Sequence, residues 1–186
     1  MHEKIILIGP IGAGKTTLSN LVARELNLPC VHMDDVRMRF YQEIGFDREE
    51  AKRLQSVEGF LGLYRYWKPF EVHAVERLVS EPGSAVLDFG GGHAVQEDGE
   101  HFSRVERALA PFANVILVLP SPSKEESIQI LRERVGVVES GGVDFHEHFV
   151  CHHSNYDLAK QIVYTQNRSP QETCEEIVSI VRRSRL

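Results

Sequence analysis

The chain has 186 residues, of which 42% are hydrophobic and 26% are charged, and its formal net charge is −6 at pH 7. These proportions are typical of one globular domain, and the acidic balance argues against a general nucleic-acid or membrane binder, because phosphate groups attract basic surfaces. No apolar run approaches the roughly 18 residues of a membrane span, and the first residues lack a signal-peptide pattern. Because three scattered cysteines also indicate a reducing compartment, we expect a cytoplasmic protein.

A glycine-rich stretch near the N-terminus carries the strongest functional signal. Residues 9–16 read GPIGAGKT and fit the phosphate-loop pattern G-x-x-x-x-G-K-[ST]. The apolar run Ile5–Ile8 before it predicts a buried strand, and the apolar spacing of Thr17–Leu26 after it predicts a helix. In that context Lys15 reaches the β- and γ-phosphates of ATP, and the Thr16 hydroxyl binds Mg²⁺. The predicted nucleotide-binding residues are Gly9, Gly12, Ala13, Gly14, Lys15, Thr16 and Thr17.

Two aspartates follow the second predicted strand, Cys30–Met33. Ligands of parallel α/β sheets bind beyond the carboxyl ends of the strands, which places Asp34 and Asp35 near the phosphate loop. Each aspartate either caps the next helix or orients an acceptor hydroxyl and accepts its proton. We favour the second role for Asp34 and expect Arg37 to hold an anionic group of the acceptor.

A largely helical pattern extends from Phe46 to Ser80, with Asp47 and Ser56 as candidate caps. Aromatic residues are concentrated between positions 60 and 71, which hold five of the fifteen in the chain, and Pro69 predicts a kink or the first turn of a new helix there. The aromatic side chains either pack into the core or form one wall of an acceptor site. We prefer the second interpretation, in which the segment 35–80 binds the acceptor and two cations grip it, Arg65 and Lys68.

The third predicted strand, Ala85–Phe89, leads into three consecutive glycines. An apolar run that ends in an aspartate has the Walker-B form, so we predict that Asp88 binds Mg²⁺ together with Thr16. The bare glycine backbone either forms a tight turn or approaches the acceptor closely. We favour the approach and expect substrate contacts from Gly90, Gly91 and Gly92, whereas His93 either contacts the acceptor or caps the turn.

Two arginines near the end of a later predicted helix mark a candidate lid. This helix follows the fourth predicted strand, Val115–Leu119, and starts at Ser123 with Glu126 completing a capping box. A glycine-containing loop at 136–142 supplies a hinge, so we predict that the segment 132–148 closes over the phosphates and that Arg132 or Arg134 neutralises transition-state charge. The histidines between 146 and 153 do not match a zinc-binding spacing, and we interpret them as polar helix faces.

The last predicted strand, Gln161–Thr165, precedes a terminal helix with a capping box at Ser169. We expect Arg168, in the loop between them, to stack on the adenine of the nucleotide. Five apolar runs separated by helical patterns predict a three-layer α/β/α fold around a five-stranded parallel sheet, as in P-loop NTPases. The whole chain, 1–186, then forms a single domain.

The assembled pattern resembles the shikimate kinase-like group of P-loop small-molecule kinases, relatives of the nucleoside monophosphate kinases. The resemblance rests on the loop Gly9–Thr16, the acidic site at Asp34, the triple glycine, the arginines of the lid and the closing strand–loop–helix at 162–181. It implies a kinase that transfers the γ-phosphoryl group of Mg·ATP to a hydroxyl of a small-molecule metabolite. We expect a monomer or a homodimer.

The chain also departs from that group. Where shikimate kinases have Asp-x-Asp, this chain has His32-x-Asp34, and their Phe-Arg-x-x-Glu corresponds at best to WKPFE at residues 67–71. Lysine cannot reproduce the bidentate contact of arginine with a carboxylate, which argues against shikimate as the acceptor. Residues 34–37 also resemble the Asp-Asp-x-Arg of polynucleotide 5′-kinases, so a nucleotide or polynucleotide 5′-hydroxyl kinase is one alternative. An ATP-binding switch without an acceptor is another.

Overall fold

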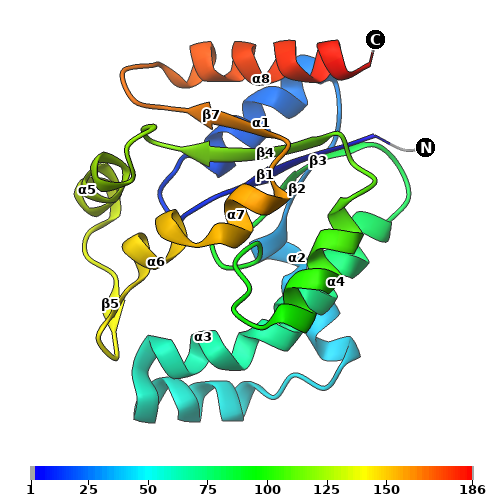
Figure 1. Cartoon of the computed structure of the whole chain (residues 1–186). Helices are drawn as coiled ribbons and strands as arrows, with labels where there is room; N and C mark the ends of the chain where they lie inside the picture. Colours follow the sequence, from blue (N-terminus) through cyan, green and yellow to red (C-terminus); the bar gives the residue numbers. More distant parts are fainter. Residues whose placement is uncertain (1–2, 186) are drawn as a thin grey trace.

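A five-stranded parallel β-sheet forms the centre of the computed structural model, which describes residues 3–185. Its strands lie in the order β2-β3-β1-β4-β7, and Figure 1 shows helices on both faces, as in the predicted three-layer fold. The predicted sheet is confirmed, with each strand end displaced by at most one residue. The strands are β1 (Lys4–Ile8), β2 (Cys30–His32), β3 (Ala85–Asp88), β4 (Asn114–Leu119) and β7 (Gln161–Tyr164).

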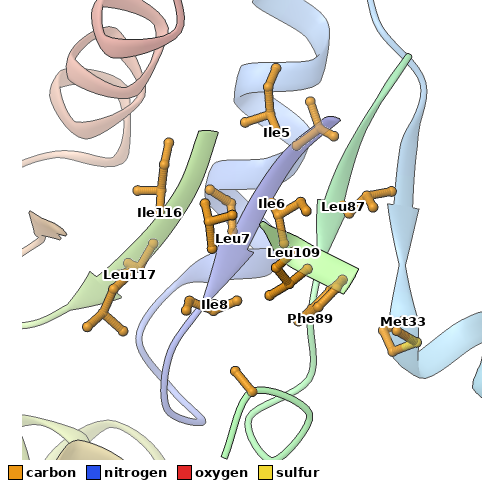
Figure 2. Packing of buried hydrophobic residues seen from close by; sticks show 14 of the residues in the cluster. Ile5, Ile6, Leu7, Ile8, Met33, Leu87, Phe89, Leu109, Ile116 and Leu117 are labelled. Carbon is orange, nitrogen blue, oxygen red and sulfur yellow. The ribbon is translucent and has the colours of Figure 1, made fainter. Parts of the chain in front are cut away.

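The central strands of the sheet are covered on both faces. Every residue of β1 and β4 is buried, as expected of continuous apolar runs in a parallel sheet. Figure 2 shows the side chains that pack around β1, among them Ile6, Leu7, Leu87, Ile116 and Leu117. Close packing of this kind holds the carboxyl ends of the strands in fixed positions, and these ends carry the candidate site residues.

Helices complete the other two layers of the fold. Helices α1 and α8 pack side by side on one face of the sheet, while α4 and α7 lie on the other face, next to α2 and α3 (Figure 1). Helices α5 and α6 pack against each other beyond the arrowheads of β4 and β7. Within residues 3–185 no helix combines the length and the apolar character that crossing a membrane requires. The helices are α1 (Lys15–Leu26), α2 (Met33–Glu43), α3 (Arg48–Ser80), α4 (Gly99–Leu109), α5 (Lys124–Val135), α6 (Phe145–Cys151), α7 (His153–Leu158) and α8 (Pro170–Ser184).

Side-chain caps fix most of the predicted helix starts. Asp47 accepts hydrogen bonds from two backbone N–H groups in the first turn of α3, and Ser169 forms the complete predicted capping box at α8. Ser123 caps α5, but the predicted box is only half formed there. The carboxylate of Glu126 accepts a hydrogen bond from Ser121 Oγ at 2.5 Å instead of returning to the backbone of the cap.

The capping alternative for the two aspartates after β2 is wrong. The N-cap position of α2 is His32, which makes no side-chain cap, and Asp34 and Asp35 lie in the first turn of the helix. Negative side chains are favourable there because they face the positive end of the helix dipole. The carboxylate of Asp34 is therefore not used in capping α2.

Helix α3 is broken at Gly59 and not at Pro69, which corrects the predicted position of the kink. Gly59 has φ 68° and ψ −158°, a combination that is open almost only to glycine, whereas the backbone stays helical through Pro69. Ser56 does not act as a cap either, because its hydroxyl donates to the Lys52 carbonyl oxygen inside the helix. The break divides α3 into two parts that meet close to Ser140.

The predicted loop at 136–142 contains part of a small antiparallel hairpin. Strand β5 (Glu139–Ser140) pairs with β6 (Val143–Asp144), and two glycines with positive φ form the turn, as in type I′ hairpins. The hairpin is attached to α3 at the helix break, where the Leu61 N–H donates to Ser140 Oγ at 3.1 Å. A second apolar cluster joins α3 to the hairpin and α6: Phe60, Leu61, Tyr64, Val95, Val138, Val143, Phe145 and Phe149.

Candidate active site

The phosphate loop between β1 and α1 has the geometry that anion binding needs. Gly14 precedes the first residue of α1 with φ of 96°, and a Cβ on it would meet no atom within 4 Å. The first backbone N–H groups of a helix have no partners within the helix and favour a phosphate. Gly9 packs closely against β4, where a Cβ would lie 2.4 Å from the Val118 carbonyl oxygen. The loop therefore offers an open cradle that fits the predicted triphosphate.

The side chain of Lys15 is folded back over this loop. Its Nζ donates a hydrogen bond to the Pro10 carbonyl oxygen at 2.9 Å, and the residue is 6% exposed. Burial lowers the pKa of Lys15, whereas the negative charges of Asp88 and Asp34 act in the opposite direction. A phosphate is a stronger partner for an ammonium group than a neutral carbonyl, because the hydrogen bond is then charge-assisted on both sides.

The two residues predicted to bind Mg²⁺ meet at the carboxyl ends of β1 and β3. Thr16 Oγ1 donates a hydrogen bond to Asp88 Oδ2 at 2.7 Å. Hydroxyl and carboxylate oxygens are the hard ligands that Mg²⁺ prefers, so this pair fits the ion. Sequence reasoning missed His32, whose Nδ1 lies 3.0 Å from the same oxygen of Asp88. The signal would have been the strand order, because His32 and Asp88 are register partners in β2 and β3.

A cavity of about 160 Å³ opens at one end of the phosphate loop, between α1, α5 and the start of α8. Arg134 lies over the loop: its Nη1 donates to the Gly12 carbonyl oxygen at 3.3 Å and to Thr165 Oγ1 at 3.4 Å. Arg168 lines the same cavity and is paired with Glu176. The structure thus brings together five of the residues predicted to contact the nucleotide or its phosphates: Ala13, Gly14, Thr17, Arg134 and Arg168.

Arg132, the other candidate lid arginine, is paired with a carboxylate at the end of the hairpin. Its Nε and Nη2 donate to Asp144 Oδ2 at 3.1 and 2.5 Å. Asp144 is also the N-cap of α6, so the ion pair connects α5 to the junction between the hairpin and α6. Of the two predicted arginines, Arg132 is thus engaged in an ion pair with Asp144, whereas Arg134 contacts the phosphate loop.

A second cavity, of about 270 Å³, begins at Ile11 of the same loop and coincides with the predicted acceptor site. A Cβ on Gly91 would lie 2.5 Å from Ile11 Cγ1, so the glycine loop after β3 approaches the phosphate loop closely. Five predicted substrate-binding residues line this cavity, together with residues from α3 and α6. The lining comprises Ile11, Asp34, Arg37, Phe60, Tyr64, Trp67, Glu71, Gly90, Gly91, Gly92, His93 and Phe149.

The charges at the mouth of the acceptor cavity are partly paired. The Asp34 side chain is 63% exposed, and its Oδ1 lies 3.6 Å from Arg37 Nη1. The Arg37 guanidinium also stacks on Trp67, with Cζ 4.7 Å from the ring centroid. Aromatic side chains thus line this cavity, and Trp67 holds Arg37 in place beside Asp34.

Neither cation predicted in α3 reaches the acceptor cavity. Lys68 is buried in an ion pair with Glu71 at 2.7 Å, and its Nζ donates to the carbonyl oxygens of Gly92 and Val95 at 3.0 and 2.9 Å. It supports the glycine loop and does not line the cavity. The cavity face of α3 consists of positions 60, 64, 67 and 71, which share one side of the helix. Arg65 is exposed and lies roughly 100° around the helix from Tyr64, which excludes it from that face.

Glu97 connects α3 to α6. Tyr64 Oη donates to Glu97 Oε1 at 2.5 Å, and His148 Nε2 of α6 lies 2.7 Å from the same oxygen. Burial alone would raise the pKa of Glu97, but the hydrogen bonds and the charge of Lys68 hold it at about 2. His148 therefore has a partner that the sequence did not reveal. Within residues 3–185 no three His, Cys, Asp or Glu side chains are grouped so as to hold a metal ion.

Comparisons with known proteins agree with this geometry. Residues 5–57, which contain the phosphate loop and Asp34, match the family described as "ATPase family associated with various cellular activities (AAA)". A shikimate kinase from Marinomonas sp. (strain MWYL1) is 26% identical over 183 residues, which cover 96% of this chain and 92% of the relative. A shikimate kinase from Francisella tularensis subsp. holarctica is 32% identical over 90 residues, which cover 48% of this chain and 46% of the relative. The chain therefore matches about half the length of that relative.

The fold has counterparts among solved structures. The shikimate kinase from Acinetobacter baumannii, in complex with shikimate, superposes with a TM-score of 0.66 at 18% sequence identity. The superposition covers 100% of this chain and 96% of that one. The chain is thus a P-loop protein that resembles the shikimate kinase-like small-molecule kinases in fold and in sequence.

Proposed function

We propose that this chain is a kinase that transfers the γ-phosphoryl group of ATP to a hydroxyl of a small-molecule metabolite. The observation that carries the proposal is the presence of two cavities on one phosphate loop. One cavity is lined by Ala13 and Gly14, and the other begins at Ile11. A triphosphate held by the loop then has its base on one side and its last phosphate near the acceptor. The resemblance to shikimate kinases supports this reading.

The residues around the loop have distinct roles in this proposal. The loop amides and Lys15 hold the phosphates, and Thr16 and Asp88 hold Mg²⁺, which supplies charge neutralisation when it is bound. Arg134, which already contacts the loop at the Gly12 carbonyl, stabilises the charge that develops on the transferring group. Arg168 borders the adenine.

Asp34 acts on the acceptor. Its carboxylate orients the acceptor hydroxyl and takes its proton as the oxygen attacks the γ-phosphorus. The bond between the γ-phosphorus and the β,γ-bridging oxygen breaks, and ADP leaves. The carboxylate suits this role because it lines the acceptor cavity and caps no helix.

The test is a screen of hydroxyl compounds for acceptor-stimulated release of ADP from the purified chain with Mg·ATP. The panel contains sugars, polyols, cyclitols, nucleosides, hydroxy acids including shikimate, and a 5′-hydroxyl oligonucleotide. We expect a small metabolite to stimulate ADP release and to appear as a phosphorylated product by mass spectrometry. If no compound stimulates release, or if only the oligonucleotide does, the proposal is wrong.

Two neighbouring aspartates provide a matched control. Asp34→Asn should lower acceptor phosphorylation by roughly 10²–10⁴-fold, as expected for loss of a general base, while ATP binding persists. Asp35→Asn should remain near the unmodified protein, because Asp35 is exposed and does not line the cavity. Equal losses in both variants would remove the basis for the assigned role of Asp34.

A further inference from the structure

The buried face of the acceptor cavity contains a histidine whose ring nitrogens have no partner among the described residues. His93 follows the triple glycine and is only 1% exposed. Its backbone is fixed, since its N–H donates to the Gly90 carbonyl oxygen at 3.2 Å and its own carbonyl oxygen accepts from Gln96 Nε2 at 3.1 Å. Among residues 3–185, however, neither its Nδ1 nor its Nε2 has a hydrogen-bond partner. Burying a polar group without a partner is unfavourable, so a ligand that supplies the partner removes that cost.

His93 faces the same part of the cavity as the proposed base. A Cβ on Gly90 would lie 2.8 Å from His93 Nδ1 and 2.8 Å from Asp34 Oδ1, so the absent side chain lets these two groups converge. Burial lowers the pKa of His93. The charges of Glu71 and Asp34 oppose this change, and those of Arg37 and Lys68 add to it. A neutral imidazole presents one donor and one acceptor, which is the complement of a hydroxyl group.

The charges around the cavity favour an uncharged acceptor. Arg37 is paired with Asp34 and stacked on Trp67, and Lys68 is buried with Glu71. Within the described chain each cation beside this cavity thus already faces a carboxylate. A carboxylate on the acceptor would lie near Asp34 and Glu71 without a free cation to balance it. The aromatic rings of the wall suit the C–H surface of a ring or chain compound.

We propose that His93 is a specificity-determining residue that hydrogen-bonds one hydroxyl of an uncharged, polyhydroxylated acceptor, of the chemical class of sugars and cyclitols. This inference rests on the proposed kinase function and names the substrate class of the same site. The acceptor hydroxyl at Asp34 is phosphorylated, and a different hydroxyl binds the imidazole.

The first experiment compares matched acceptors with the unmodified protein. Sugars and cyclitols are tested beside the acids of the same carbon skeleton, and shikimate is included among the acids. We expect kcat/KM for the uncharged member of a pair to exceed that of the acid by at least tenfold. A preference for the acids would overturn this inference and leave the kinase function standing. Absence of stimulation by every compound would overturn both.

The second experiment pairs a protein change with a ligand change. His93→Phe keeps a planar ring and removes both nitrogens, and it should reduce kcat/KM for the best acceptor by roughly tenfold to a hundredfold, with ATP affinity unchanged. Deoxy analogues that each lack one hydroxyl are measured with both proteins. One analogue should have a lower kcat/KM than the parent acceptor with the unmodified protein. With that analogue, His93→Phe should reduce kcat/KM only slightly further, because the two changes remove the same hydrogen bond.

A merely structural role for His93 predicts a different pattern. Every deoxy analogue would then lose the same additional factor in His93→Phe, and that result would overturn the proposal. His93→Gln, which retains a donor and an acceptor, should recover part of the lost kcat/KM. If His93→Phe fails to fold, His93→Leu, which also removes both ring nitrogens, is compared with the same deoxy analogues and gives the same test.

Discussion

Replacing Lys68 by methionine tests whether this residue supports the glycine loop or grips the substrate. The Lys68 and Glu71 side chains are 9% and 3% exposed, and the two charges lie 2.7 Å apart. Lys68→Met leaves the Glu71 carboxylate buried without its partner and removes two hydrogen bonds to backbone carbonyls. Loss of one member of a buried pair costs about 3–5 kcal/mol. Because 1 kcal/mol shifts the Tm of a chain of this size by about 2–4 °C, we expect a decrease of roughly 6–20 °C.

The measurement is thermal and urea unfolding of the variant and two controls. Arg65→Met removes an exposed cation three residues earlier in the same helix and should change the free energy of unfolding by no more than about 0.5 kcal/mol. The double variant Lys68→Met/Glu71→Gln should be more stable than Lys68→Met, since the uncompensated carboxylate is gone. If Lys68→Met keeps its Tm and loses only affinity for the acceptor, the buried-pair reasoning is refuted and Lys68 is a substrate-gripping residue.

Three further changes address the lid and the metal site. Gly59→Ala should lower the free energy of unfolding by about 1–3 kcal/mol in urea, because the backbone at the break is open almost only to glycine. Gly45→Ala is the control, since Gly45 also has a positive φ but a Cβ there would contact no other atom. The pKa of Glu97 is about 2 in the folded protein, below its ordinary 4.5, so its stabilisation is complete above pH 4.5 and is lost as the pH falls toward 2; Glu97→Gln should flatten this part of the stability–pH profile. His32→Leu removes one of the two side chains that contact Asp88 and should raise the Mg²⁺ concentration for half-maximal ATP turnover by about 10–100-fold; an unchanged titration would contradict a positioning role.

The sheet and the phosphate loop were predictable because their signals are local. Buried parallel strands need continuous apolar runs, and the loop needs glycines and a lysine at fixed spacing. The apolar run Ile5–Ile8 directly before Gly9–Thr16 therefore supported the assignment of both the strand and the loop. The positions of Asp34 and the triple glycine followed from one rule, that ligands bind at the carboxyl ends of parallel strands. Each of these inferences required only the order of the elements along the chain.

The errors have a common physical origin in contacts between distant segments. The direction of Lys68 depends on which face of α3 meets the glycine loop, and the pairing of Arg132 with Asp144 depends on how the hairpin folds back. Strands of two residues are too short to show a periodic pattern, so the sequence predicts only a loop at 136–142, where β5 lies. Proline suggested a kink at Pro69, but the structure bends where a glycine meets the hairpin.

Because of the break in α3, residues of this helix and residues of the β5–β6 hairpin, which are far apart in the sequence, depend on each other. An uninterrupted helix would use the Leu61 N–H within its own ladder, and Ser140 would lose its attachment point. Conversely, the hairpin tip turns at Gly141 with φ 59° and packs against Leu61, and a Cβ there would lie 2.6 Å from Leu61 Cδ2, so a larger residue would strain the turn and displace this side chain. Substitutions that straighten the helix and substitutions that enlarge the tip should therefore appear together among related chains, or not at all.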